Sequence, residues 1–337
     1  MKAYINAISY YLPELILDNE QISAEHPEWN ADKISQKTGI YKRHIAAADE
    51  FAGDMAVKAA SILFEEYHID PSEIDFLLYC TQSPDYLLPT TACIIQTKLG
   101  LSTSSGALDF NLGCSGYVYG LSLAKGLLYA GLAKKIVLIT SETYSKFIHP
   151  KDKSNKTIFG DAASATLISG KKGYYELGDF CFGTDGTGAE NLIVKFGGIR
   201  HRNDKGTDIM NEDGEYLKND ENLFMNGASI FSFTSSAVPL LVNKVIESNH
   251  IKQEEVDFFL FHQANKFMLD FIRKKINIPE EKFIYFLKDV GNTVSNTIPI
   301  ALKEECINKR SGNILLAGFG VGYSWGGCMI HSPTNTL

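Results

Sequence analysis

Three side chains in this chain could together perform nucleophilic chemistry on a carbonyl group: the thiol of Cys114, the imidazole of His262 and the carboxamide of Asn292. A cysteine thiolate attacks carbonyl carbon. A neutral imidazole and an amide N–H can both donate hydrogen bonds to the oxyanion that develops. Each of these residue types is more often structural than catalytic, so their meaning depends on whether the fold brings them together.

The sequence around Cys114 predicts a strand followed by a helix. Residues 106–113 (GALDFNLG) predict a short buried strand, and residues 114–131 (CSGYVYGLSLAKGLLYAG) have the apolar and small residues of a buried helix. The thiol would then lie at the helix N-terminus, where the macrodipole and free N–H groups favour a thiolate. The flanking Gly113 and Gly116 would let backbone approach a substrate closely. The alternative is a small buried cysteine that packs under the helix.

An internal repeat places the other two residues. Residues 67–82 (YHIDPSEIDFLLYCTQ) align without gaps on residues 249–264 (NHIKQEEVDFFLFHQA), and each copy ends in an apolar run that predicts a buried strand. At a similar offset Asn292 falls opposite Cys114, and each opens a helical pattern. Residues 135–140 (KIVLIT) and 313–318 (NILLAG) then match as a further pair of strands. Several matched segments in one order indicate a duplication.

Strands that alternate with helices predict an α/β protein. We expect two halves related by a pseudo-twofold axis, residues 1–175 and residues 176–337, the second starting with a crossing connection of about 176–222. Equivalent loops of the halves would meet near the axis, so Cys114 would face Asn292. His262 would lie beside them at the carboxyl end of a strand, where open α/β sheets bind ligands.

The composition excludes several classes of protein. The 337 residues are 45% apolar and 21% charged, as in soluble globular proteins. We find no apolar run long enough to span a membrane and no secretion signal, so we expect a cytoplasmic protein. The six scattered cysteines predict neither a disulfide framework nor a metal site. A net charge of −8 argues against a nucleic-acid partner.

Seven segments along almost the whole chain resemble the β-ketoacyl-acyl carrier protein synthase III family of the thiolase-like superfamily. The most specific feature is FHQAN followed about thirty residues later by GNT, after a cysteine in the first half. The resemblance implies a homodimer with a duplicated thiolase-like fold and mixed central sheets in an α-β-α-β-α layering. The segments are TGIYKRHIA (38–46), LPTTACIIQTKLG (88–100), the Cys114 turn, TIFGDAASATLI (157–168), FHQAN (261–265), GNTVSNTIPIAL (291–302) and GFGVGYSWGG (318–327).

For this chain the resemblance implies that Cys114 accepts an acyl group from a thioester donor. His262 and Asn292 then hold the thioester carbonyl of malonyl-acyl carrier protein as it loses carbon dioxide, and the enolate attacks the acyl-Cys114 thioester. The backbone N–H groups of Cys114 and Val321 would form a second oxyanion hole. The product is 3-oxoacyl-acyl carrier protein, in fatty acid or related specialised biosynthesis. Coenzyme A or phosphopantetheine enters as part of the substrates, so no separate cofactor is expected.

Three further residues match supporting positions of the family. Phe319 matches an aromatic residue that screens the acyl-enzyme from water. Asn265 matches a residue that supports the site through hydrogen bonds. Leu88 matches a position that helps to close the acyl pocket across the dimer, the alternative being simple loop packing.

Donor binding is where the chain departs from the family. The family clamps the adenine of coenzyme A between a Trp and an Arg, but here Lys153 stands at the Arg position and extra residues displace Trp29. Lysine cannot stack its head group as arginine does. The remaining candidates for contacts with the donor or its carrier are Lys266, Arg273 and Lys274, with Phe267 where the family has a basic residue. Val321 replaces a usual glycine, and Ala228 and Ser232 replace a usual Asn and Lys.

Two other functions stay open at this point. An enzyme of the same fold could pass the acyl group from Cys114 to a hydroxyl or amine without decarboxylation, although the retained His262 and Asn292 pair favours condensation. A non-catalytic partner subunit of a synthase heterodimer would have no need of the three residues. The sequence leaves open the length and branching of the acyl chain, the carrier of the donor, coenzyme A or a carrier protein, and the pathway.

Overall fold

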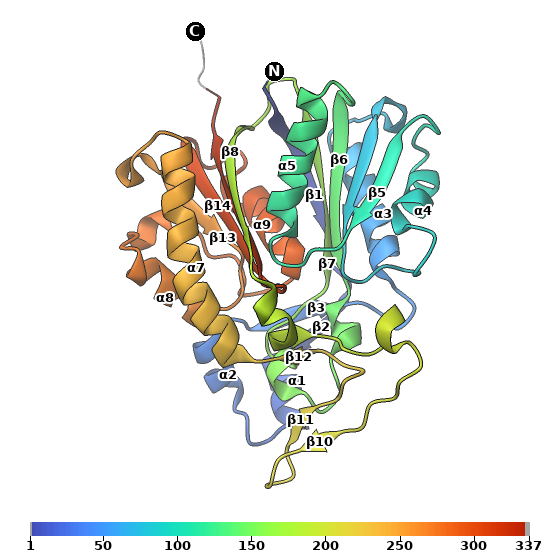
Figure 1. Cartoon of the computed structure of the whole chain (residues 1–337), viewed down its shortest axis with the longest axis vertical. Helices are drawn as coiled ribbons and strands as arrows, with labels where there is room; N and C mark the ends of the chain where they lie inside the picture. Colours follow the sequence, from blue (N-terminus) through green and yellow to red (C-terminus); the bar gives the residue numbers. More distant parts are fainter. Residues whose placement is uncertain (1, 334–337) are drawn as a thin grey trace.

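The apolar runs of the sequence form the strands of one large mixed sheet (Figure 1). The structure, a computed structural model, describes residues 2–333. Strands covered on both faces are almost entirely apolar, as in β4 (FLLYC) and β14 (NILLAGFG). From edge to edge the sheet contains β13 (Phe258–Phe261), β14 (Asn313–Gly320), β15 (Ser324–His331), β8 (Tyr175–Thr184), β1 (Tyr4–Tyr11), β7 (Ala162–Ser169), β6 (Lys135–Glu142), β4 (Phe76–Cys80) and β5 (Gly106–Phe110).

The two sides of this sheet repeat one pairing pattern. On the first side β4 pairs with β6 in parallel, and β6, β7 and β1 follow in antiparallel order. On the second side β13 pairs with β14 in parallel, and β14, β15 and β8 follow in antiparallel order. The repeated sequence segments hold equivalent strands, β4 with β13 and β6 with β14. Pairing of Tyr4 with Glu176 and of Ile5 with Tyr175 joins the two sides.

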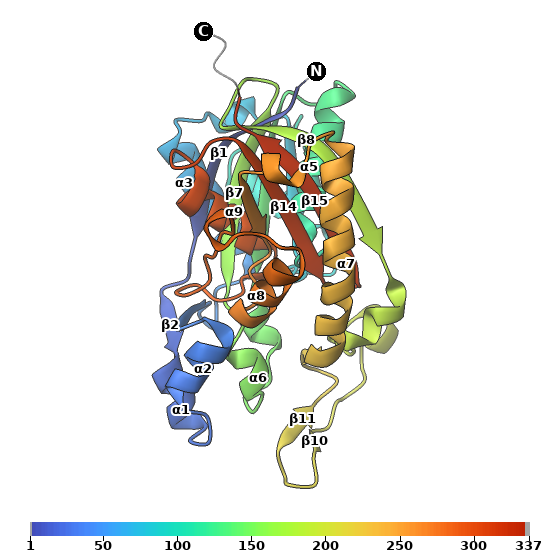
Figure 2. The ribbon, with the colours of Figure 1, turned by 90° about the vertical axis from the view of Figure 1, so that its left-hand side faces the viewer.

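The helices lie in three layers, one between the two sides of the sheet and one on the outer face of each side. Helices α5 (Gly116–Tyr129) and α9 (Thr297–Ala301) are buried in a core that contains strands of both sides. Helices α3 (Ala52–Glu66) and α4 (Thr91–Lys98) cover the first side. Helices α7 (Gly227–Ser248) and α8 (Lys266–Lys275) cover the second (Figures 1 and 2). The result is an α-β-α-β-α layering.

Helix α5 and the strand before it are shorter than the sequence predicts. β5 ends at Phe110 and α5 begins at Gly116, so Cys114 precedes the helix by two residues. The helix packs closely on the sheet at Gly120, where an added Cβ would lie 2.5 Å from Leu138 Cδ1. Its end is set by Gly131, whose φ of +72° is favourable only for glycine.

Helix α7 is, among residues 2–333, the one helix long and apolar enough to cross a membrane by length and composition. It packs on β8, β14 and β15. Its residues Val238, Leu241, Val242 and Val245 are buried in the core of the second side. Packing against the sheet therefore explains the apolar residues on the buried face of this helix.

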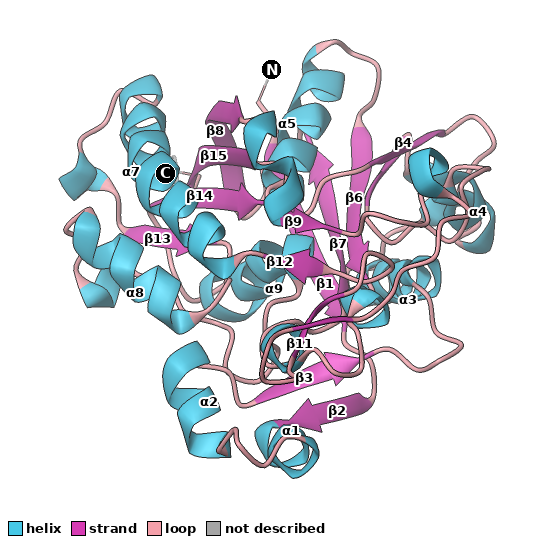
Figure 3. Cartoon of the chain, turned by 60° about the horizontal axis from the view of Figure 1, so that its bottom comes forward, coloured by secondary structure: helices cyan, strands magenta, loops and turns pink. Residues whose placement is uncertain are grey.

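The smaller elements gather at the end of the molecule below the sheet. Figure 3 shows β2 (Leu15–Asp18), β3 (Lys42–Ile45), α1 (Asn19–Glu25) and α2 (Ala31–Thr38) together there. The short helix α6 (Lys153–Lys156) and the hairpin of β10 (Ile209–Met210) and β11 (Tyr216–Lys218) lie at the same end (Figure 2). The first residues of the predicted connection 176–222 belong to β8, and the rest form short elements, including β9 (Leu192–Ile193). The division of the chain at residue 175 stays a prediction.

Replacement of Leu121 in α5 tests the central helical layer. Leu121 is fully buried between the two sides of the sheet, whereas Leu123 of the same helix is 42% exposed. We expect Leu121→Ala to lower the free energy of unfolding by about 2–5 kcal/mol, because it leaves a cavity. Leu123→Ala should change it by about 0.5 kcal/mol. Urea unfolding measures both, and equal losses would contradict a buried α5.

Candidate active site

The turn that carries Cys114 is enclosed by the end of β14. A Cβ at Gly320 would lie 2.7 Å from Cys114 Sγ, and a Cβ at Gly318 would lie 2.6 Å from the Cys114 carbonyl oxygen. Only glycine allows this approach. Cys114 is consequently buried, with 7% of its surface exposed.

Asn292 reaches Cys114 because its main chain is bonded to the first half of the chain. Its N–H donates to the Ile158 carbonyl (2.9 Å), and its own carbonyl accepts the N–H of Gly160 (3.0 Å). Its side-chain Oδ1 accepts the N–H of Val294 (2.9 Å). Since that N–H can only donate, the orientation of the amide is fixed and Nδ2 is the group left for another acceptor.

His262 follows β13 directly, and its imidazole is held at one nitrogen. Its Nδ1 lies 2.8 Å from Thr297 Oγ1, and this hydroxyl also lies 3.1 Å from the carbonyl oxygen of Val294. Burial lowers the pKa of His262 to about 3, although the Val294 carbonyl opposes the shift. The imidazole is therefore neutral near pH 7. The one hydroxyl proton of Thr297 can go to either neighbour, so both tautomers of His262 can be accommodated.

Cys114, His262 and Asn292 line one cavity of about 130 Å³. Phe319 closes one side, with its ring edge-on to the imidazole at 5.9 Å between centroids. Hydrogen bonds to a developing oxyanion are stronger in a site with a mostly apolar lining. The apolar lining consists of Ile158, Phe159, Leu192, Met225, Ile230, Ala264, Met268 and Phe319.

The expected thiolate at Cys114 is wrong for the resting protein. Burial, with a smaller contribution from the charge of Glu142, raises the pKa of Cys114 to about 12. The N–H groups of Val321 and of Cys114 itself oppose the shift but do not outweigh it. Cys114 precedes α5, so the helix N-terminus is less effective than its position in the sequence suggests. The resting residue is a neutral thiol.

The same backbone N–H groups lie close to the Cys114 sulfur, where the sequence predicts an oxyanion hole. Those of Val321 and Cys114 both act on the Cys114 sulfur. Val321 is not among the described residues with positive φ, so its branched side chain costs no backbone strain. Its Cγ1 would lie 2.7 Å from a Cβ at Gly113, so it closes over the cysteine turn. The departure from glycine at this position leaves the N–H in place.

Glu142 is a buried carboxylate that the sequence interpretation missed. It ends β6 and accepts hydrogen bonds from the Gln82 N–H (3.1 Å), the Ser83 hydroxyl (3.1 Å) and the Ser295 hydroxyl (3.4 Å). Burial raises the pKa of Glu142 to about 8. The sequence feature that could have indicated Glu142 is an acidic residue at the end of an apolar strand, KIVLITSE. Glu142 joins the first half to the segment that carries Asn292.

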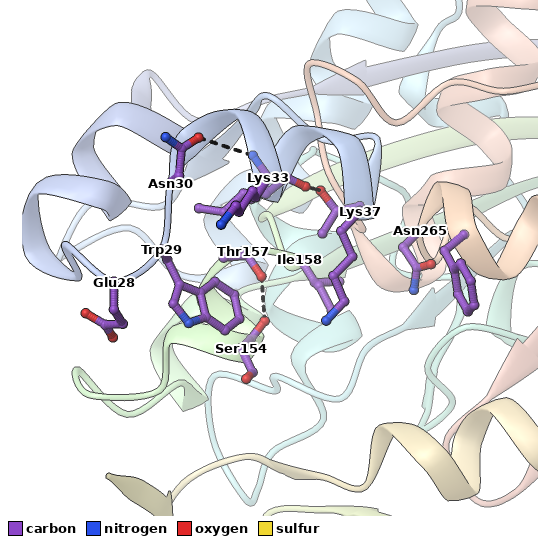
Figure 4. Close-up of a pocket in the computed structure, with 12 residues that line it drawn as sticks. Glu28, Trp29, Asn30, Lys33, Lys37, Ser154, Thr157, Ile158 and Asn265 are labelled. Atoms are coloured by element: carbon purple, nitrogen blue, oxygen red, sulfur yellow. Dashed lines mark hydrogen bonds between the residues drawn. The ribbon is translucent and has the colours of Figure 1, made fainter.

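A second cavity, of about 330 Å³, lies next to the first, and Figure 4 shows the residues that line it. Ile158 and Asn265 line both cavities. Asn265 caps α8, with its Oδ1 accepting the N–H of Met268 (2.9 Å). We call the second cavity the entrance. Its other lining residues are Glu28, Trp29, Asn30, Lys33, Ile34, Lys37, Thr38, Ser154, Thr157 and Phe267.

The structure brings Trp29 and Lys153 together, with Lys153 Nζ 5.6 Å from the centre of the Trp29 ring. Trp29 lines the entrance, whereas Lys153 does not. The basic residues of α8 lie outside the lining of both cavities. Lys266 forms an ion pair with Asp270 (2.6 Å), and Arg273 donates to the Tyr285 hydroxyl (3.2 Å). Lys274 lies in the last turn of the helix.

Leu88, like the basic residues of α8, lies apart from the predicted site residues that line the cavities. It is 83% exposed and does not line the cavity of Cys114. It lies just before α4 beside two further exposed residues, Tyr86 and Leu87. In a single chain, therefore, this residue cannot close an acyl pocket.

Comparison with known proteins places the chain in one family. Residues 108–186 match the family described as 3-oxoacyl-acyl-carrier-protein (ACP) synthase III, and residues 246–332 match the family of its C-terminal part. A β-ketoacyl-acyl-carrier-protein synthase III 2 of Halalkalibacterium halodurans is 36% identical over 332 residues, covering 98% of this chain and 96% of the relative. A β-ketoacyl-acyl-carrier-protein synthase III of Clostridium perfringens is 33% identical over 95% of this chain and 96% of its own.

Solved structures agree with this assignment. A crystal structure of a 3-oxoacyl-acyl-carrier-protein synthase III has a TM-score of 0.94 at 47% identity, covering 98% of this chain and 100% of its own. A synthase III of Thermus thermophilus has a TM-score of 0.85 at 30% identity, covering 98% of this chain and 99% of its own. The fold and the site define a thiolase-like acyltransferase. The chain belongs to the β-ketoacyl-acyl carrier protein synthase III family, and the family and fold class expected from the sequence are confirmed.

Alkylation of Cys114 tests the raised thiol pKa. We expect its inactivation by iodoacetamide to accelerate about tenfold per pH unit between roughly pH 7 and 10 without levelling off, because only the thiolate reacts. Glu142→Gln should accelerate it above about pH 8, where the native carboxylate is charged. Cys93→Ser removes the exposed cysteine as background. A rate that levels off below pH 8 would show a preformed thiolate.

Proposed function

We propose that Cys114, His262 and Asn292 catalyse the condensation of an acyl thioester with malonyl-acyl carrier protein, with loss of carbon dioxide. The product is 3-oxoacyl-acyl carrier protein, in fatty acid biosynthesis. The main observation behind this proposal is that the three side chains line one cavity. Because Oδ1 of Asn292 accepts the N–H of Val294, its Nδ2 is available to a substrate. The acyl carriers arrive as parts of the substrates, and the reaction needs no cofactor.

In the first half-reaction the Cys114 sulfur attacks the carbonyl carbon of the donor thioester. The bond from that carbon to the carrier's sulfur breaks, and the thiol proton ends on the departing thiol. A resting thiol suits this exchange, because the leaving thiolate takes the proton that Cys114 gives up. His262 Nε2 can relay this proton when the ring proton is on Nδ1. The N–H groups of Cys114 and Val321 would stabilise the tetrahedral oxyanion.

In the second half-reaction His262 and Asn292 act on the malonyl thioester. Asn292 Nδ2 and His262 Nε2–H donate to its carbonyl oxygen, while the carboxylate leaves as carbon dioxide and its electron pair forms the enolate. The enolate carbon attacks the acyl-Cys114 carbonyl and expels the Cys114 sulfur, which takes a proton from solvent. The Thr297 hydroxyl supports both half-reactions. It can accept a hydrogen bond from Nδ1–H of His262 in the first, and in the second its donation to Nδ1 places the ring proton on Nε2.

Condensation fits this cavity better than acyl transfer to a hydroxyl or amine. Decarboxylation requires donors for a second oxyanion, and the cavity provides Asn292 Nδ2 and a neutral imidazole besides the two backbone N–H groups. Transfer to a heteroatom would leave the Asn292 amide without a role. In a non-catalytic subunit none of the three side chains would have a role.

The entrance is proposed to take the pantetheine arm of the substrates. It ends at Asn265 and Ile158, which also line the cavity of Cys114. Asn265 would support the site as the cap of α8, and Phe319 would keep water from the acyl-enzyme. Lys266, Arg273 and Lys274 are on the surface helix α8, so their role would be toward the carrier protein.

A homodimer is proposed from one edge of the sheet. Strand β5 is an edge strand, and unpaired strand edges favour association with a second chain. Tyr86, Leu87 and Leu88 are 61%, 59% and 83% exposed in the loop between β4 and α4. Pairing of two β5 edges would bury these side chains and bring Leu88 toward the partner's acyl pocket.

A cytoplasmic location is proposed from the cysteines. All six are free thiols, of which three lie in or next to central strands of the sheet. Thiols are kept reduced in the cytosol, whereas exported proteins usually oxidise theirs.

Replacement of Asn292 separates the two half-reactions. We expect Asn292→Ala to leave acylation of Cys114 measurable by intact mass, and to slow carbon dioxide release from malonyl-acyl carrier protein by about 10²–10³. Asn292→Asp is the matched variant, because it keeps an acceptor for the Val294 N–H and removes the Nδ2 donor. Normal decarboxylation with failed acylation in both variants would reverse the assigned roles and favour the acyltransferase.

Sedimentation of a Leu88 variant tests the dimer. We expect a homodimer at micromolar concentration, and we expect Leu88→Asp to weaken it because a charge would enter the interface. Leu240→Asp is the control, since Leu240 is 63% exposed on α7. A fully active monomer would contradict the proposed dimer.

A further inference from the structure

Strand β3 carries an arginine that is fully buried, Arg43. In residues 2–333 its hydrogen bonds go to an amide oxygen and a main-chain carbonyl, with no carboxylate among its partners. Burial lowers the pKa of Arg43 to about 10, with the charge of Asp18 opposing the shift, so the guanidinium is charged near pH 7. A buried charge without a carboxylate partner is costly to a fold. The presence of this arginine therefore needs an explanation other than stability.

Two hydrogen bonds fix the guanidinium of Arg43. Its Nη1 donates to Asn19 Oδ1 (2.6 Å), and its Nη2 donates to the main-chain carbonyl of Thr157. The Asn19 amide is fixed in turn, because its Nδ2 donates to the Ile40 carbonyl (2.8 Å). The Nε of Arg43 is buried without a hydrogen-bond partner in the described part of the chain. The planar fork is thus aimed at Asn19 and Thr157 alone.

The carbonyl held by Arg43 belongs to the residue before the main-chain contacts of Asn292. The next residue, Ile158, accepts the N–H of Asn292 (2.9 Å), and Gly160 donates to the Asn292 carbonyl (3.0 Å). Residues 157–161 therefore form the short segment on which the Asn292 loop is fastened.

Strand β3 is bonded to both ends of this segment. At the far end the N–H of Asp161 donates to the His44 carbonyl (2.8 Å), and Asp161 Oδ2 accepts the N–H of Ala46 (2.8 Å). At the near end the bond from β3 is the one that the Arg43 side chain makes to Thr157. Loss of this side chain would release the end of the segment that binds the Asn292 N–H.

The stem of Arg43 packs against the main chain of the same two segments. A Cβ at Gly160 would lie 3.3 Å from Arg43 Cβ, and a Cβ at Gly291 would lie 3.1 Å from Arg43 Cγ. Gly291 has a φ of +70°, which favours glycine, and it directly precedes Asn292. The arginine therefore supports both chains that meet at Asn292.

We propose that Arg43 is a positioning residue for Asn292, holding its amide toward the cavity of Cys114. The inference rests on the proposed function, since Asn292 acts there on the malonyl thioester. Arg43 lines neither cavity, so it acts through the main chain of residues 157–160 and 291–292 and not on a substrate. Acylation depends on the N–H groups of Cys114 and Val321, so the effect of Arg43 falls on the second half-reaction.

The rates of the two half-reactions in Arg43→Met test the proposal. Methionine keeps an apolar stem and removes both hydrogen bonds, and replacement of a buried charge by an apolar group need not unfold a protein. We expect acylation of Cys114, measured by intact mass, to stay within about threefold of the native rate. The kcat of carbon dioxide release from malonyl-acyl carrier protein should fall by about tenfold or more, because the Asn292 amide is displaced.

Michaelis constants separate this effect from a change of the entrance. Thr157 and Ile158 also line the entrance (Figure 4), which both substrates are proposed to use. A displaced entrance alone would raise the KM of both substrates and leave kcat unchanged, and this result would overturn the inference.

A double-variant cycle with Asn292→Ala separates positioning from a purely structural role. If Arg43 acts through the Asn292 amide, Arg43→Met slows carbon dioxide release in the native background and causes no further loss in Asn292→Ala. Arg43→Lys gives a second cycle with the same expectation, because lysine keeps the charge but lacks the planar fork. It decides the question if Arg43→Met does not fold. Leu121→Ala is the control for lowered stability and should keep the native ratio of the two rates.

Three results would overturn the inference and leave the proposed function standing. They are equal losses in both half-reactions, the same further loss in the Asn292→Ala background as in the native one, and a native kcat in the Arg43 variants. A ratio shifted as far by Leu121→Ala as by Arg43→Met would also overturn it. Absence of carbon dioxide release by the native protein would instead contradict the proposed function itself.

Discussion

The two main-chain hydrogen bonds of Asn292, one to Ile158 and one from Gly160, are the contacts on which the proposed site depends. They fasten a loop of the second half to the first half, at the level of the cysteine turn. Side chains of β6 add to the joint, Thr140 with Asn296 (2.5 Å) and Glu142 with Ser295 (3.4 Å). The duplicated architecture has this consequence: each half supplies one wall of a cavity that neither half could form alone.

Burial at this joint decides the charge state of the reacting groups. It raises the pKa of the Cys114 thiol and lowers that of the His262 imidazole, so both are neutral near pH 7. Neutral groups avoid the cost of buried unpaired charge. They also suit a reaction in which protons travel with the leaving thiol and charge develops only on oxyanions. The Thr297 hydroxyl completes this arrangement, since it can serve either tautomer of the imidazole.

Local sequence patterns predicted much of this structure, and long-range contacts explain what they missed. The repeat predicted the equivalence of β4 with β13 and of β6 with β14, because buried strands keep their apolar pattern. The spacing of Cys114, His262 and Asn292 within the repeat predicted their meeting. The roles of Glu142 and Thr297 depend on partners distant in the sequence, and so does the pairing of Lys153. The helix start two residues after Cys114 and the raised thiol pKa depend on packing that no local pattern records.

The most direct test of the central claim is mass spectrometry of the protein after reaction with an acyl thioester and malonyl-acyl carrier protein. The proposed function predicts an acyl adduct on the peptide that contains Cys114 when the donor is given alone. On addition of malonyl-acyl carrier protein the adduct should disappear, with 3-oxoacyl-acyl carrier protein and carbon dioxide formed in equal amounts. An adduct that persists in the presence of malonyl-acyl carrier protein, or a condensed product formed by Cys114→Ser, would contradict it.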